Sequence, residues 1–125
     1  MDVGEAVGRP IPFASLLGIR LRTREPGHVL LELDLREALM NSAGTAHGGV
    51  LMTLLDVAMS IAARSARPDT TFAVTMEMKT SFIAPARGRM RVSYCKNPMN
   101  RRPLRQALSG SNWNETPDTI EPISI

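Results

Sequence analysis

The stretch Asn41-Ser-Ala-Gly-Thr-Ala-His47-Gly48-Gly49-Val-Leu-Met-Thr-Leu-Leu-Asp56-Val-Ala58 joins a polar loop to a long helical pattern. From Val50 to about Ser65, apolar residues recur at helical spacing and form one wide stripe: Val50, Leu51, Leu54, Leu55, Ala58 and Ala62. The opposite face carries Asp56 beside Met52, Met59 and Ala63. A face that contacted water would carry several charges. We therefore expect this second face to be covered too, most simply by another subunit.

The residues at the start of this helix have the properties of an oxyanion site. Gly48 and Gly49 allow a backbone to come close to a ligand, and the first helical turn offers unpaired N–H groups to a developing negative charge. Asp56 would bring a carboxylate to it. Each residue also has a simpler structural explanation: His47 as a hydrogen-bonded loop residue, Asn41 as a turn residue, and Asp56 as an interface acid paired with a partner's arginine.

The segments on either side of the helix predict antiparallel strands. Residues 13–18 form a short helical pattern that ends at Gly18. Residues 19–23 and 29–35 alternate in polarity around Pro26-Gly27, which predicts a hairpin. Residues 72–82 alternate over a longer stretch, and Met90, Val92 and Tyr94 begin another strand. One long helix against several antiparallel strands is an α+β plan.

The composition is that of one globular domain over residues 1–125, with 43% apolar and 22% charged residues. No apolar run approaches the roughly 20 residues of a membrane span, and the N-terminus lacks the features of a signal peptide. Cys95 is the only cysteine, which excludes an internal disulfide and fits a reducing compartment. We therefore expect a cytoplasmic protein without membrane partners.

The net charge is +3, and the positive charges are scattered, with arginines that alternate along two predicted strands at positions 20, 22, 24, 87, 89 and 91. One Trp, one Tyr and three Phe leave few platforms for stacking bases, so we expect no nucleic-acid partner. The arginines are interpreted either as solvated strand faces or as a mild attraction for an anionic small molecule such as a phosphate-bearing cofactor. Two histidines, His28 and His47, are too few for a convincing metal cluster, so no metal is expected.

The spacing Asn41-x2-Gly44-x2-His47-Gly48-Gly49-x4-Leu54-x-Asp56-x-Ala58 resembles the signature of hotdog-fold acyl-CoA thioesterases of the PaaI type. That group includes one class of 4-hydroxybenzoyl-CoA thioesterase and the thioesterase superfamily members. The resemblance continues through residues 74–86, which end in an aromatic-x-x-Pro-Ala turn, and covers residues 13–92 in all. It implies a hotdog fold, in which an antiparallel β-sheet wraps one long central helix.

The resemblance also implies a role for individual residues. Asp56 attacks the thioester or activates the attacking water, and the Gly48 N–H binds the thioester oxygen, which is worth roughly 3–4 kcal/mol of barrier. Asn41 orients the water or the thioester, His47 holds the loop and that asparagine, and Thr75 reaches the site from the neighbouring subunit. The substrate is expected to contact Gly49, Met52, Met59 and Phe82.

The implied activity is hydrolysis of an acyl-CoA to a free acid and coenzyme A by a homodimer or a dimer of dimers. It needs no cofactor beyond the coenzyme A of the substrate. The alternative is a hotdog domain that binds acyl-CoA or only dimerises, with little turnover. A hotdog hydratase would need a histidine five residues after Asp56, where this chain has Ile61.

Residues 93–125 depart from the family pattern. Residues 105–113 resemble its last strand but arrive about 15 residues early, and residues 117–122 begin and end with proline. Either one strand is shortened or deleted, or this third of the chain follows a different frame, so the sheet is expected to be incomplete. Arg101 and Arg102 are candidates for the coenzyme A phosphates by charge alone.

Overall fold

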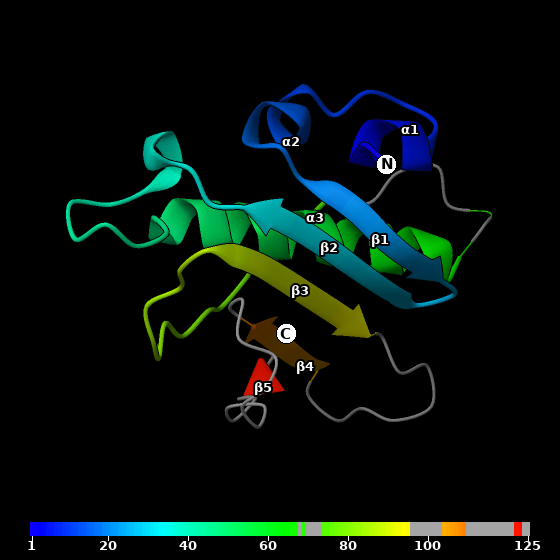
Figure 1. The fold of residues 1–125 in the computed structure, drawn as a ribbon. Coiled ribbons are helices and arrows are strands. Elements are labelled where there is room, and N and C mark those ends of the chain that lie inside the picture. The colour runs from blue at the N-terminus through cyan, green and yellow to red at the C-terminus, as the bar shows by residue number, and fades with distance from the viewer. Residues whose placement is uncertain (68, 70–73, 96–103, 110–121, 124–125) are drawn as a thin grey trace.

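One long helix, α3 (Gly48–Ser65), lies across one face of an antiparallel sheet, as Figure 1 shows. The computed structural model describes residues 1–67, 69, 74–95, 104–109 and 122–123. The sheet runs in the order β1 (Arg20–Glu25), β2 (His28–Asp34), β3 (Arg89–Cys95), β4 (Leu104–Ser109) and β5 (Pro122–Ile123). All neighbouring strands are antiparallel. This arrangement confirms the predicted α+β plan.

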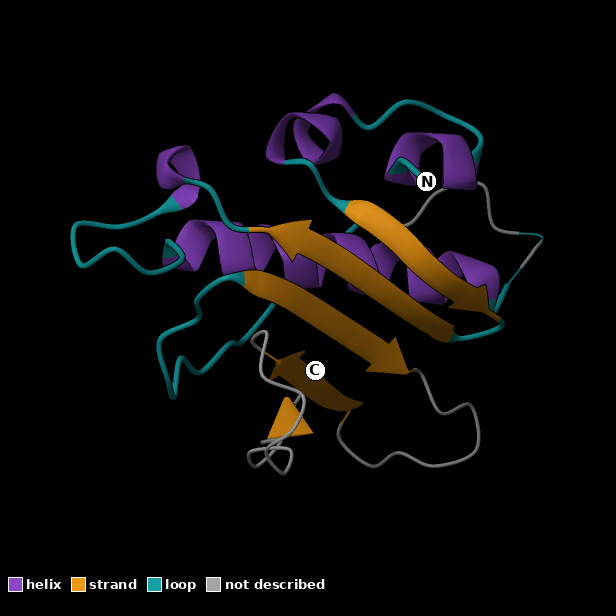
Figure 2. Cartoon of the chain, viewed as in Figure 1, coloured by secondary structure: helices purple, strands orange, loops and turns teal. Residues whose placement is uncertain are grey.

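The helix is inserted between two strands that lie side by side in the sheet. β2 pairs with β3 along its whole length, from His28 opposite Cys95 to Asp34 opposite Arg89. The chain therefore leaves β2, crosses the sheet as α3, and returns to place β3 beside β2 (Figure 2). β4 and β5 continue the sheet beyond β3, so part of the atypical C-terminal region does form strands.

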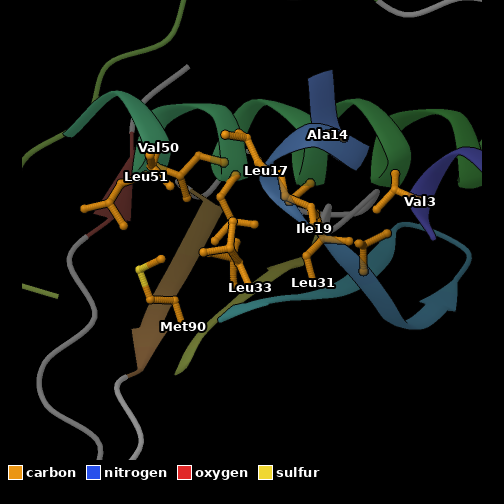
Figure 3. Packing of buried hydrophobic residues seen from close by; sticks show 14 of the residues in the cluster. Val3, Ala14, Leu17, Ile19, Leu31, Leu33, Val50, Leu51 and Met90 are labelled. Atoms are coloured by element: carbon orange, nitrogen blue, oxygen red, sulfur yellow. The ribbon is translucent and has the colours of Figure 1, made fainter. Parts of the chain in front are cut away.

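The core lies between α3 and the sheet. The whole predicted stripe of α3 is buried, together with Ile61, and it faces buried residues of β2 and β3: Val29, Leu31, Leu33, Met90 and Val92. Figure 3 shows these side chains meeting Leu17 and Ile19 from the N-terminal segment. By length and composition α3 could also span a membrane, but its buried stripe is what the core helix of a domain presents.

Two short helices cover the end of this core. α2 (Pro12–Leu17) confirms the predicted helix of residues 13–18 and ends at Gly18, whose φ of 77° suits glycine. α1 (Val3–Val7) was not predicted from the sequence. The Asp2 side chain accepts a hydrogen bond from the Gly4 N–H at its start and another from the Ser15 hydroxyl of α2. The two short helices are thus tied together.

The long strand predicted over residues 72–82 is wrong for the described part of that segment. Residues 74–83 run without strand pairing, while residues 72 and 73 lie outside the described residues. Four apolar side chains of the segment stand exposed: Val74, Met76, Phe82 and Ile83. Alternation predicts the two faces of a strand, but a strand also needs a neighbour for its backbone N–H and C=O groups. No described strand of the same chain lies beside this segment.

The alternating arginines surround two carboxylates on the outer face of the sheet. Glu32 stands opposite Arg20 of β1 and Arg91 of β3, and Arg22 is the extra residue of a bulge in β1. The guanidinium groups of Arg20, Arg91 and Arg22 donate to the Glu32 carboxylate at 3.1, 2.9 and 2.5 Å, respectively. Asp34 pairs in the same way with Arg20 and with Arg89. These arginines therefore contact carboxylates of their own chain.

This arginine network lowers the pKa of both carboxyl groups that it contains. The hydrogen bond from Arg22, with those from Arg91 and Arg20, outweighs the cost of burial and lowers the pKa of Glu32 to about 2. Hydrogen bonds from Arg20 and then Arg89 likewise lower the pKa of Asp34 to about 2. The Glu32 side chain is fully buried although the sequence places it on the polar side of its strand. The arginine side chains around Glu32 remain partly exposed to solvent, so the strand face is solvated at the arginines but not at Glu32.

Candidate active site

The loop before α3 is held by hydrogen bonds of its own residues. The Asn41 side-chain oxygen accepts from the N–H groups of Ala43 and Thr45, and its amide nitrogen donates to the buried Thr45 hydroxyl at 2.8 Å. Gly44 adopts φ 71° at the tip of the turn. In this geometry Asn41 shapes the loop and positions the start of the helix.

The loop delivers its last residues to a fixed place. The His47 N–H donates to the Leu39 carbonyl, and the Ala46 N–H donates to the Ala86 carbonyl, which joins the loop to the segment before β3. His47 is the N-cap of α3, and its Nδ1 accepts from the Gly49 N–H at 3.0 Å. His47 therefore sets where α3 begins.

The cap leaves one N–H group of the first turn for a ligand. Gly49 already donates to His47, whereas the Gly48 N–H takes part in none of the hydrogen bonds found among the described residues. A Cβ added at Gly48 would lie 3.5 Å from the Phe82 ring. Phe82 therefore borders the helix start, and the Gly48 N–H is suited to an oxyanion beside an apolar wall.

The second part of the candidate site lies two turns along α3. Asp56 is partly buried, and its Oδ1 accepts a hydrogen bond from the Thr75 hydroxyl of the same chain. This differs from the expectation that Thr75 comes from the neighbouring subunit. The hydrogen bond fixes one carboxylate oxygen in place.

Asp56 borders a hollow of about 310 Å³ between α2 and α3. Apart from Thr53, its other walls are apolar, and they include Ile11 and Phe13 of the N-terminal segment, Met52 and Val57 of α3, and Met78. Met52 was predicted to contact substrate. Met59 is partly buried against the core instead, and Phe82 lies at Gly48. Sequence periodicity could not have found Ile11, Phe13 or Met78, because chain folding alone brings them to Asp56.

Within one chain, Gly48 and Asp56 are too far apart to act on one small group. They are separated by eight residues of continuous helix, or about 12 Å along the axis at 1.5 Å per residue. A reacting carbonyl must lie within about 3–3.5 Å of the attacking oxygen and about 3 Å of its oxyanion donor. A single copy thus presents two half-sites, one at each of these positions. Across the described residues there is no cluster of three metal-ligating side chains.

Comparisons with known proteins give a family for this geometry. The family model described as a domain of unknown function, DUF4442, matches residues 3–116. A protein of Halobacterium salinarum that carries the provisional name of an esterase is 35% identical over 79 residues, which are 59% of this chain and 52% of that protein. The chain thus spans about half the length of the curated relatives it matches.

Solved structures show the same fold. A thioesterase family protein from Silicibacter pomeroyi superposes with a TM-score of 0.76 at 26% identity, over 98% of this chain and 88% of that one. A mutant of the phenylacetic acid degradation protein PaaI from Thermus thermophilus superposes with a TM-score of 0.66 at 25% identity, over 79% and 86% of the two chains. The predicted hotdog fold is confirmed.

Proposed function

Because this chain belongs to the DUF4442 family and has the hotdog fold of PaaI-like thioesterase-superfamily proteins, we propose that it hydrolyses an acyl-CoA thioester to a free carboxylic acid and coenzyme A. The observation that carries the proposal is Asp56, a carboxylate fixed by Thr75 at the edge of an apolar hollow. An apolar hollow suits an acyl group, and the carboxylate stands where the carbonyl of that group would enter.

Two routes use the same carboxylate. As a nucleophile, an Asp56 oxygen bonds to the thioester carbon, the C–S bond breaks with departure of the coenzyme A thiolate, and water then hydrolyses the resulting anhydride. As a general base, Asp56 removes a proton from a water whose oxygen attacks that carbon directly, the C–S bond breaks, and the departing coenzyme A thiolate takes up the proton. The carbonyl oxygen gains negative charge in both routes, and the Gly48 N–H would stabilise it.

The distance along α3 favours a site shared between two copies. Since Gly48 and Asp56 of one chain lie about 12 Å apart along the helix, one thioester would take its oxyanion donor from one copy and its carboxylate from the other. In a two-fold dimer such an arrangement occurs twice, because each copy supplies both halves to different sites.

Two features of the chain favour such a partner. Residues 74–83 make no strand pairing, and four of their apolar side chains are exposed, among them Met76 at 98% and Val74 at 79%. A second copy would supply both the missing strand neighbour and a cover for these side chains. Met52, which lies beside Asp56 on the face of α3 opposite the buried stripe, is also exposed and would be covered. A homodimer is therefore part of the proposal.

The carboxylate is tested by Asp56→Asn, which keeps the side-chain shape. Hydrolysis of a panel of aryl-CoA and straight-chain acyl-CoA substrates should fall by at least about 100-fold, while the thermal unfolding temperature stays within a few degrees. Equal rates in the two proteins would remove Asp56 from the mechanism. Tight binding of acyl-CoA by the wild-type protein without any hydrolysis would instead point to a binding domain.

The oxyanion donor is tested by a pair of variants at Gly48. Proline is favoured at the first position of a helix, and His47 before it has ψ 137°, which a following proline accepts. Gly48→Pro therefore removes the N–H with little damage to α3, whereas Gly48→Ala keeps the N–H and adds only an ordinary contact to Phe82. We expect about a 10²–10³-fold loss of kcat in the proline variant alone. Equal activity of both variants would exclude this N–H.

A further inference from the structure

The hollow beside Asp56 has one wall that comes from outside the central helix. Phe13 is the second residue of α2, and it lines the hollow while 57% of the residue remains exposed. An exposed aromatic ring on the rim of an apolar hollow has surface left to bury. The ring is therefore placed to contact whatever fills the hollow.

The position of this ring is fixed by the rest of α2. Ala14 and Leu17 are buried in the core, and Gly18 ends the helix in a left-handed conformation. Ser15 is hydrogen bonded to Asp2, so the helix is also tied at its outer side. The burial of Ala14 and Leu17 and the bond of Ser15 to Asp2 hold the backbone of α2, and with it Phe13, beside the hollow.

The residues that line the hollow suit the acyl part of the substrate better than its coenzyme A part. Every lining side chain except Asp56 is uncharged, and the Asp56 carboxylate would repel the phosphates of coenzyme A. The occupant that fits is an apolar acyl chain, with its carbonyl at the carboxylate.

We propose that Phe13 determines the length of the acyl group that the enzyme accepts. This inference rests on the proposed thioesterase function and assigns a specificity residue to the same site. Each methylene buried in the hollow raises kcat/KM by about fourfold, at roughly 0.8 kcal/mol per group. The rise stops when the chain meets the Phe13 ring. A chain that extends further must remain outside.

The test compares wild type, Phe13→Ala and Leu16→Ala on straight-chain acyl-CoA substrates from four to sixteen carbons. Leu16 is the matched control, because it is a comparably exposed apolar residue of α2 that does not line the hollow. Phe13→Ala should move the optimum of kcat/KM to chains at least two carbons longer, while Leu16→Ala keeps the wild-type profile. Superimposable profiles for wild type and Phe13→Ala would overturn the proposal, as would an equal shift in the control.

A second measurement separates this inference from the proposed function. Straight-chain alcohols of four to twelve carbons are neutral probes without a thioester, and their binding is followed by the rise in unfolding temperature. If no acyl-CoA is hydrolysed, a dependence of alcohol binding on chain length that Phe13→Ala alone extends would still support the role of Phe13. Equal binding in all three proteins would refute it, whatever the outcome for hydrolysis.

Discussion

Replacing Glu32 with glutamine removes the charge at the centre of the arginine network and keeps the shape of the side chain. Three guanidinium groups would then surround a neutral amide, and one amide oxygen would have to accept in place of two carboxylate oxygens. Glu32 lies on β2, opposite Arg20 of β1 and Arg91 of β3. The change therefore acts on the three strands that cover α3. We expect a loss of folding stability with no change in the candidate site.

The size of the stability loss in Glu32→Gln follows from the lowered pKa of Glu32. A tenfold change in proton affinity equals about 1.4 kcal/mol. The pKa of Glu32 falls from the ordinary glutamate value of 4.5 to about 2 in the folded protein. This difference limits the contribution of the Glu32 charge to folding stability to about 3 kcal/mol. The arginine side chains are 32–48% exposed, and water screens their attraction. We expect Glu32→Gln to lower the free energy of unfolding by about 1–2 kcal/mol at neutral pH.

The direction in which the stability contribution of Glu32 changes with pH follows from its lowered pKa. The folded protein holds Glu32 with a pKa of about 2, below the 4.5 of the unfolded chain, so the unfolded state binds a proton first as the pH falls. The stabilisation is complete above pH 4.5 and disappears as the pH approaches 2. The stability difference between wild type and Glu32→Gln should therefore shrink steadily over that window.

Urea unfolding at pH 7, 4 and 3, at one fixed protein concentration, measures this difference. Asp34→Asn is the matched control, since it removes a charge from the same network at a position that is 47% exposed, and it should cost less than about 1 kcal/mol. The reasoning fails if the two variants lose the same stability, or if the loss in Glu32→Gln is independent of pH.

Two further predictions concern the candidate site. Thr75→Ala should lower kcat by about tenfold or more, because it removes the hydroxyl that fixes Asp56. Thr75→Ser keeps the hydroxyl and should remain close to wild type. Equal kinetics in the two variants would mean that this hydrogen bond has no role. His47→Ala should destabilise the protein by about 1 kcal/mol in urea unfolding through loss of the helix cap, and an unchanged midpoint would show that the cap at Gly49 contributes nothing.

The sequence predicted the parts of the fold whose pattern is local. Val50 to Ala62 repeat at helical spacing, and each residue of that stripe is buried in α3. The hairpin around Pro26-Gly27 and the short helix that ends at Gly18 also depend on neighbouring residues alone. Local pattern was insufficient for residues 74–82, because strand formation requires a neighbour that the described part of this chain does not supply.

The candidate site likewise contains some residues that the local sequence pattern predicts and others that it does not. Asn41, Gly48 and Asp56 are recognisable from their spacing, and the loop geometry explains why Asn41 bonds to its own turn. The walls at Phe13 and Met78 have no such signal, since they come from segments far from α3 in sequence. The burial of Glu32 depends on arginines from two different strands, a cross-strand relation that alternation in one strand cannot reveal.

The shared site is tested most directly by combining two inactive chains. Gly48→Pro and Asp56→Asn chains carrying different affinity tags are co-expressed, and dimers that contain one of each are purified through both tags. If each site takes its N–H from one copy and its carboxylate from the other, such a dimer has one intact site and one doubly defective site. A shared site therefore predicts about half the wild-type rate per mixed dimer. A mixed dimer no more active than either parent would contradict it.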